Sequence, residues 1–313
     1  MARNIQELGP TFSVRAAREA GITEKRLRNP NLGRPFRGVR TLERSTPTAH
    51  DVQDERDDAW RRIRAYAEIM PAHAFFVGPT AALIAGVPLP SGLHREIHVG
   101  VEFPRTPPRR PGVRGTRISV SGSVHVAQGL RIAAPAVTWA TLAPHLGEYD
   151  LVAATDHLLR VPRSPGGLVR LERTQPYATH ASLARVLEQH RWRGSGALRG
   201  ALARARTGAS SRPETWSRLL IVDAGLPEPV LDYDVYDRDG EFLGAADLAY
   251  PDRKVAIEYE GSGHRERVQF ERDIDRFARY EDAGWSFVRL TAHHVFRFPE
   301  EALRRIARKV GPD

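Results

Sequence analysis

The chain has 313 residues, a net charge of +9 and no cysteine, so disulfides and thiolate zinc sites are excluded. No apolar run approaches the roughly 20 residues that a membrane span needs, and the N-terminus has no apolar signal core. We therefore expect a cytoplasmic protein with no membrane association. The basic excess is almost entirely arginine, whose forked guanidinium matches phosphate, although a GC-rich genome would produce the same bias.

Residues 1–48 predict a small DNA-binding head. Ser13 is suited to cap a helix that Gly21 ends, and Thr23 is suited to cap a second short helix. A strand over residues 36–41 follows, which completes the order of a winged helix-turn-helix. The same pattern is also explained if this head is purely structural and does not contact nucleic acid. In the DNA-binding interpretation, five arginines contact phosphates: Arg26, Arg28, Arg34, Arg37 and Arg40.

The middle of the chain predicts α/β structure without a recognisable catalytic spacing. Residues 49–165 contain both helical and strand patterns and form the expected middle domain. Residues 166–206 predict a helical connector, and residues 207–313 form the last domain. The expected fold class is therefore α/β with several domains.

The last domain predicts an αβββαβα order, a sheet with helices on both sides. A helix capped by Ser211 comes first, because Pro213 suits its first turn. The elements that follow are three strands over residues 230–237, 241–250 and 254–260, a helix over 265–283, a strand over 285–290 and a closing helix over 299–310.

Two acids stand at the ends of one predicted hairpin in this domain. If Tyr250 pairs with Val255, antiparallel pairing places Asp247 directly opposite Glu258. Facing side chains have Cβ atoms about 4.5–5.5 Å apart, and like charges there destabilise a sheet unless a cation lies between them. The period of two also puts Glu260 on the face of Glu258. Three carboxylates therefore converge, and Mg²⁺ prefers such oxygen ligands.

Two resemblances follow from these motifs. The segments DLAYPDRKVAIEYEGSGH, ERDIDR and AGWSFVRLT resemble the very-short-patch-repair endonuclease domain of the PD-(D/E)XK, restriction-endonuclease-like superfamily, over residues 207–313. The segments FSVRAAREAGI, RPFRGVRT and VGPTAALIAGVPLP are similar to winged-helix abortive-infection antitoxin regulators.

The first resemblance implies hydrolysis of phosphodiesters with Mg²⁺ or Mn²⁺. The metal ligands would be Asp247, Glu258 and Glu260, although the broad superfamily has lysine at the position of Glu260. Arg276 would then balance phosphate charge, and His264 would transfer a proton.

Three of the implied residues have structural alternatives. Glu214 is either an acid near the metal or part of a capping box, in which it accepts the backbone N–H of Ser211. Arg276 is also placed to form a surface ion pair with Asp273, and His264 fits an exposed loop.

The sequence thus predicts a metal-dependent DNA endonuclease in phage defence or DNA repair. The alternative is a DNA-binding transcriptional regulator of the antitoxin type, in which the nuclease fold is an inactive scaffold. A toxin that cleaves RNA is a third hypothesis. DNA is the expected partner, together with a second copy of the chain in a homodimer and a toxin–antitoxin or defence partner.

Overall fold

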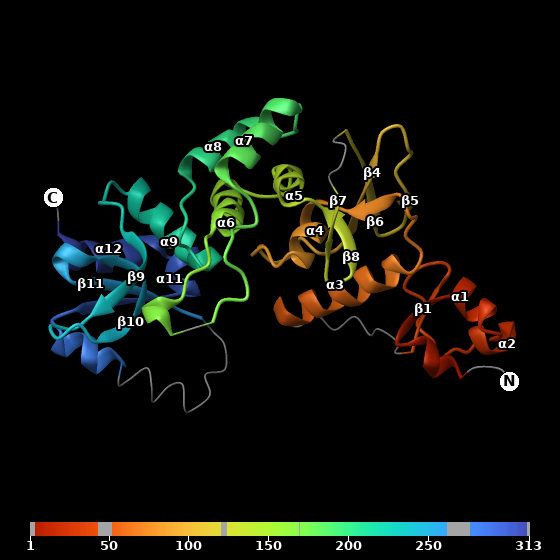
Figure 1. Cartoon of the computed structure of the whole chain (residues 1–313), viewed down its shortest axis with the longest axis horizontal. Helices are drawn as coiled ribbons and strands as arrows, with labels where there is room; N and C mark the ends of the chain where they lie inside the picture. The colour runs from red at the N-terminus through yellow and green to blue at the C-terminus, as the bar shows by residue number, and fades with distance from the viewer. Residues whose placement is uncertain (1–3, 43–51, 120–123, 169, 262–275, 312–313) are drawn as a thin grey trace. The chain divides into compact units, whose positions relative to one another are not determined.

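The computed structural model describes residues 4–42, 52–119, 124–168, 170–261 and 276–311. Over these residues it is a mixed α/β structure with three sheets, and the chain divides into two compact units, residues 1–145 and 146–313 (Figure 1). Among the described helices, none has both the length and the apolar content to cross a membrane.

The head at the start of the first unit is a two-stranded sheet with short helices. Ser13 caps the first α-helix as expected, because its Oγ accepts the Ala16 N–H at 3.1 Å. The second strand begins at Val39 rather than at residue 36, since Phe36 turns into the core and packs edge-on against Tyr66. The elements are η1 (Ile5–Leu8), β1 (Thr11–Ser13), α1 (Val14–Glu19), α2 (Glu24–Leu27) and β2 (Val39–Thr41), with β1 and β2 antiparallel.

A six-stranded sheet in the order β5-β6-β4-β3-β8-β7 forms the rest of the first unit. Its core is continuous with the head, because Phe36 and Val39 are buried in the same cluster as Ile63 of α3. The elements are α3 (Val52–Ala67), β3 (Ala74–Phe76), α4 (Gly78–Ile84), β4 (Ile97–Glu102), β5 (Arg109–Arg110), β6 (Val113–Ile118), β7 (Val124–Ala127), β8 (Leu130–Ala133) and α5 (Pro135–Leu142).

The second unit begins earlier than the expected domain boundary at residue 165. Helix α6 (Glu148–Leu159) belongs to this unit because its buried Asp156 forms an ion pair with Arg218 of α9 (Arg212–Asp223), at 3.2 Å. The expected connector contains η2 (Pro165–Gly167), α7 (His180–Gln189) and α8 (Ser195–Arg204), and α8 packs on α6. The connector is therefore part of one compact unit with the last domain.

A four-stranded sheet in the order β12-β11-β10-β9 carries the candidate site. Its outer pair β11–β12 is parallel, and the other pairs are antiparallel. The expected order of elements appears in the described residues, with an additional short helix α11 and with residues 276–282 in the position of the expected second helix. The elements are β9 (Val230–Tyr236), β10 (Phe242–Tyr250), η3 (Pro251–Arg253), β11 (Val255–Glu260), β12 (Ser286–Thr291), α11 (Ala292–Phe296) and α12 (Pro299–Val310).

The hairpin register that the sequence predicts is confirmed. Tyr250 pairs with Val255, and Leu248 pairs with Ile257. The predicted faces are also confirmed, because Ile257 packs in the cluster that contains Ile306 of α12, whereas Ala256 packs on the opposite face with Tyr280. Glu258 therefore lies on the face of the sheet that residues 276–282 cover.

Candidate active site

Three of the predicted acids come together at one end of the hairpin. Asp247 and Glu258 follow the last pair of the β10–β11 ladder, Leu248 with Ile257, so the same register places them opposite each other. The Tyr259 N–H donates to Asp247 Oδ2 at 2.8 Å, beyond that last pair. Glu214, in the first turn of α9, is close enough to act electrostatically on Glu258. The carboxylates thus meet where backbone pairing between the strands ends.

Burial and mutual repulsion raise the pKa values of these acids. Burial, followed by repulsion from Asp247, raises the pKa of Glu258 to about 8. The same two causes, in the same order, raise the pKa of Glu214 to about 7. Burial also raises the pKa of Asp247, against the opposing effects of the Tyr259 N–H and Arg276. Such shifts in neighbouring groups are typical of functional sites.

Buried polar atoms without a hydrogen-bond partner gather at the same place. Within the described part of the chain, they include Glu258 Oε1, Arg276 Nε and Tyr280 Oη. Tyr280 approaches the sheet closely, since a Cβ on Gly244 would lie 2.9 Å from its Oη, and the φ of +154° at Gly244 suits glycine. Unpartnered buried polar groups are rare and call for an explanation such as a missing ion, water or ligand.

The remaining predicted residues differ in how the structure places them. Arg276 Nη2 lies 3.5 Å from Glu258 Oε2, which fits its expected role beside the acids. The alternative ion pair with Asp273 involves a residue outside the described ranges, and so does the expected role of His264. Glu260 is half-buried at the end of β11 and pairs with Thr291.

Glu214 forms only half of the expected capping box. Ser211 Oγ accepts the Glu214 N–H at 3.4 Å, as predicted. The Glu214 carboxylate accepts the N–H of Ser210 at 2.6 Å, whereas the prediction named the N–H of Ser211. The backbone before the cap turns so that the preceding N–H faces the carboxylate. Ser211 therefore caps the helix, while Glu214 fixes the residue before the cap and adds its charge to the acid cluster.

Sequence reasoning missed a fourth acid of this group, Asp232. It lies between Leu231 and Tyr233, the partners of Leu248 and Ala246, and so stands beside Asp247 in the sheet. Its φ is +49°, a left-handed conformation that is strained for a residue other than glycine. The local sequence gives no signal of this left-handed conformation, because Asp232 lies in an ordinary strand pattern. The conformation depends on a partner that is distant in the sequence.

That partner is Arg163, from the segment between α6 and η2. Its Nε and Nη2 bind both carboxylate oxygens of Asp232 at 2.6 and 2.8 Å, and its Nη1 binds Asp234 at 2.8 Å. A bidentate pair of this sort is stronger and more directional than a single contact. Arg163 thereby compensates two acids at the edge of the cluster.

Arg163→Met is expected to lower the free energy of unfolding by about 1–3 kcal/mol, because two carboxylates lose their charged partner. Urea unfolding measures the change. Arg279→Met is the control, since Arg279 pairs with Glu241 on the surface, where both side chains are exposed, and such pairs contribute at most about 1 kcal/mol. Equal losses in the two variants would contradict the role of Arg163.

The donor set suits a hard cation bound through few protein ligands. Among the described residues, no group of three or more acid or histidine side chains is arranged to hold a metal ion. Mg²⁺ commonly takes one or two carboxylates and completes its shell with waters and substrate phosphates. Asp247 and the unpartnered Oε1 of Glu258 fit that mode, with all-oxygen donors next to each other.

Four of the five head arginines expected to contact DNA are exposed: Arg26, Arg28, Arg34 and Arg37. Arg40 is half-buried, and it donates to the carbonyl oxygens of Leu27 and Val39 at 2.9 and 2.8 Å. It thus joins α2 to β2, and most of its bonding capacity serves the fold of the head.

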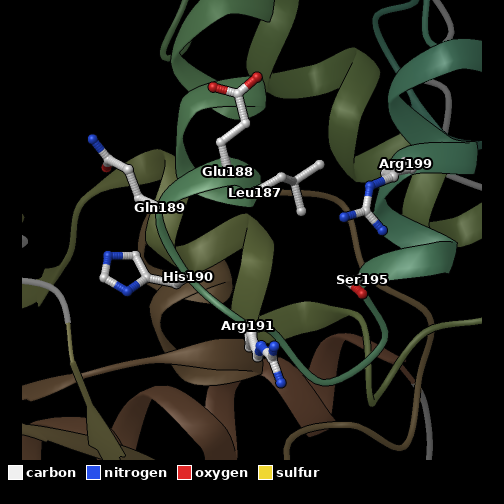
Figure 2. A pocket seen from close by; sticks show the side chains of 7 residues that line it. All are labelled: Leu187, Glu188, Gln189, His190, Arg191, Ser195 and Arg199. Carbon is white, nitrogen blue, oxygen red and sulfur yellow. The ribbon is translucent and has the colours of Figure 1, made fainter.

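A separate cavity of about 510 Å³ lies between α7 and the start of α8, and none of the candidate acids lines it (Figure 2). Its lining includes Arg191, Ser195 and Arg199, which Figure 2 shows around one hollow. Both arginines are exposed. The cavity is therefore a surface hollow distinct from the acid cluster.

The chain is similar to two proteins of Mycobacterium tuberculosis. They are Uncharacterized protein Rv2248 of strain ATCC 25618 / H37Rv and Uncharacterized protein MT2308 of strain CDC 1551 / Oshkosh. Each is 34% identical over 199 residues, which cover 63% of this chain and 71% of the relative. The chain belongs to the family of these mycobacterial proteins. No family model and no solved structure matches it.

Proposed function

We propose that the protein is a metal-dependent DNA endonuclease, with α9 to α12 as a PD-(D/E)XK core and residues 1–48 as a winged-helix head. The observation that carries this proposal is the placement of half-buried Asp247 opposite buried Glu258, next to Glu214, just beyond the last pair of the hairpin ladder. Facing carboxylates at this depth are unfavourable when both are ionised, and a bound cation would remove that cost.

The residues have distinct proposed roles. Asp247 and Glu258 would hold Mg²⁺ or Mn²⁺, and Glu260, predicted as a third ligand but not grouped with them in the described part of the structure, would orient water. When bound, such a cation polarises a phosphate and makes water a better nucleophile near neutral pH. Arg276, beside Glu258, would balance the charge that develops on the phosphate, and His264 would move a proton.

Incubation of supercoiled plasmid with the purified protein and Mg²⁺ tests the proposal. We expect nicking that EDTA stops, and we expect Asp247→Asn and Glu258→Gln to lose at least about 100-fold in rate, the order of magnitude for one essential electrostatic contact. Glu241→Gln is the control because Glu241 is exposed and stands just before β10. RNA in place of plasmid tests the toxin hypothesis.

Nicking that survives both acid substitutions would refute the assignment. A second candidate function, the antitoxin-type regulator, is supported by the exposed head arginines and by the lack of a three-ligand metal group among the described residues. Sequence-dependent DNA binding without cleavage, lost in Arg26→Ala with Arg37→Ala, would favour the regulator. A homodimer and a defence partner remain predictions for either function.

A further inference from the structure

A basic hollow lies in the first unit, where α3 faces the start of the head. Its volume is about 510 Å³, and its lining includes Thr11 of β1, Gln128 beside β8 and five residues of α3: Arg56, Asp57, Trp60, Arg61 and Arg64. None of these residues belongs to the acid cluster or to the five head arginines. The hollow is thus a separate candidate binding site.

Three of the α3 residues form one stripe along the helix. Arg56, Trp60 and Arg64 are spaced by four residues, so they lie one above another over roughly 12 Å of the helix axis. Both arginines are exposed, Trp60 is half-buried, and the Arg64 guanidinium lies 5.6 Å from the centre of the Trp60 ring. The stripe places an aromatic ring between two cations.

Nearby acids leave part of this positive charge uncompensated. Arg61 pairs with Asp58 at 3.5 Å, but both side chains are exposed, and such a pair contributes little. Asp57 also lines the hollow. Neither Arg56 nor Arg64 forms an ion pair with any residue that the structure describes. Three guanidiniums against two carboxylates, Asp57 in the lining and Asp58 beside Arg61, leave a positive excess that favours a polyanion.

The two sides of the hollow are fixed to each other. Phe36 and Val39 of the head are buried in one cluster with Ile63 and Tyr66 of α3, and the Phe36 and Tyr66 rings meet edge-on at 5.4 Å. Because the head and α3 share this core, the hollow is preformed. A preformed site loses little free energy to ordering when its ligand binds.

We propose that this basic hollow is a groove that binds a single strand of nucleic acid. Phosphates would pair with Arg56, Arg61 and Arg64, and a base would stack on Trp60. A cationic groove combined with an aromatic platform is the general means of binding single strands, because every base has a stacking face. An acidic protein would also pair with the three arginines, but it has no bases to stack on the Trp60 ring. The proposal stands apart from the endonuclease proposal, since it involves none of the candidate catalytic residues.

Fluorescence anisotropy with a labelled oligodeoxynucleotide in EDTA tests the groove without cleavage. The triple variant Arg56→Gln, Arg61→Gln, Arg64→Gln is expected to lose at least about tenfold in affinity. The slope of log affinity against log salt should fall by about 0.7 for each phosphate contact removed. Trp60→Leu should weaken binding by about fivefold or more and abolish the quenching of tryptophan fluorescence by the bound strand.

A second triple variant, Arg105→Gln, Arg109→Gln, Arg117→Gln, changes the net charge equally at exposed positions of the same unit and should keep most of the affinity. Equal losses in the two triple variants, or displacement of the strand by polyglutamate with no effect of Trp60→Leu, would overturn the proposal. So would unchanged binding in the groove variant, with folding verified by circular dichroism. If the protein binds the strand through the groove but does not nick plasmid, that result counts only against the endonuclease proposal.

Discussion

Without divalent cations, Glu258→Gln is expected to be more stable than the wild-type protein near pH 8, by an amount on the order of a few kcal/mol. The cause is the buried carboxyl, whose pKa is raised to about 8 by burial and by Asp247. Glutamine has a similar shape and carries no charge, so it removes the cost of ionising a buried acid beside two others.

The sign of the pH dependence follows from proton binding. Between the ordinary value of 4.5 and about 8, the folded protein holds the Glu258 proton and the unfolded chain does not. The stability from this group is therefore complete below about pH 4.5 and is lost as the pH rises through about 8. Glu214, with its pKa at about 7, adds a loss in the same direction.

Thermal unfolding in EDTA from acid to alkaline pH measures the effect. We expect the wild-type midpoint to fall relative to Glu258→Gln as the pH rises, and Glu241→Gln, an exposed control, to follow the wild type. Addition of Mg²⁺ should raise the wild-type midpoint most at alkaline pH, because a cation binds the ionised acids and stabilises the folded state by mass action. Parallel profiles for wild type and Glu258→Gln would show that the acid is not buried as described.

Arg218→Met is expected to lower the free energy of unfolding of the second unit by about 3–5 kcal/mol. The Arg218 side chain is only 2% exposed, and its guanidinium contacts Asp156 at 3.2 Å, Glu228 at 3.1 Å and the Arg204 carbonyl at 3.0 Å. Its removal leaves Asp156, which is 1% exposed, as a buried carboxylate without its cation. This pair joins α6 to α9, whose first turn carries Glu214.

Urea denaturation of the full chain measures this change. Arg206→Met is a matched control, because Arg206 binds the same Glu228 at 3.1 Å from an exposed position, and its loss should cost at most about 1 kcal/mol. The double variant Asp156→Leu with Arg218→Met should regain much of the lost stability, since it removes both buried charges together. A small effect of Arg218→Met would indicate that Asp156 stays protonated, in line with the upward shift that burial gives its pKa.

The two acid networks of the second unit connect stability to the candidate site. The Asp156–Arg218 pair fixes α9 against α6, and the Arg163–Asp232 pair ties the segment after α6 to β9. In each pair one partner, Asp156 or Arg163, lies outside the simple αβββαβα order. A part of the chain that sequence reasoning assigned to the middle domain or the connector thus supports the acids at which we propose that cleavage occurs.

Local sequence patterns determined the elements of the last domain and the hairpin register. The turn residues after Tyr250 and the alternation in residues 255–260 were sufficient to place Asp247 opposite Glu258, because pleating and register are local consequences of the chain. The Ser13 cap was predictable for the same reason.

Only the tertiary structure decided which distant groups surround the acids. The left-handed Asp232, its partner Arg163, the approach of Tyr280 and the extent of each compact unit depend on long-range packing, and burial by residues far along the chain is what raises the pKa values of Glu214 and Glu258.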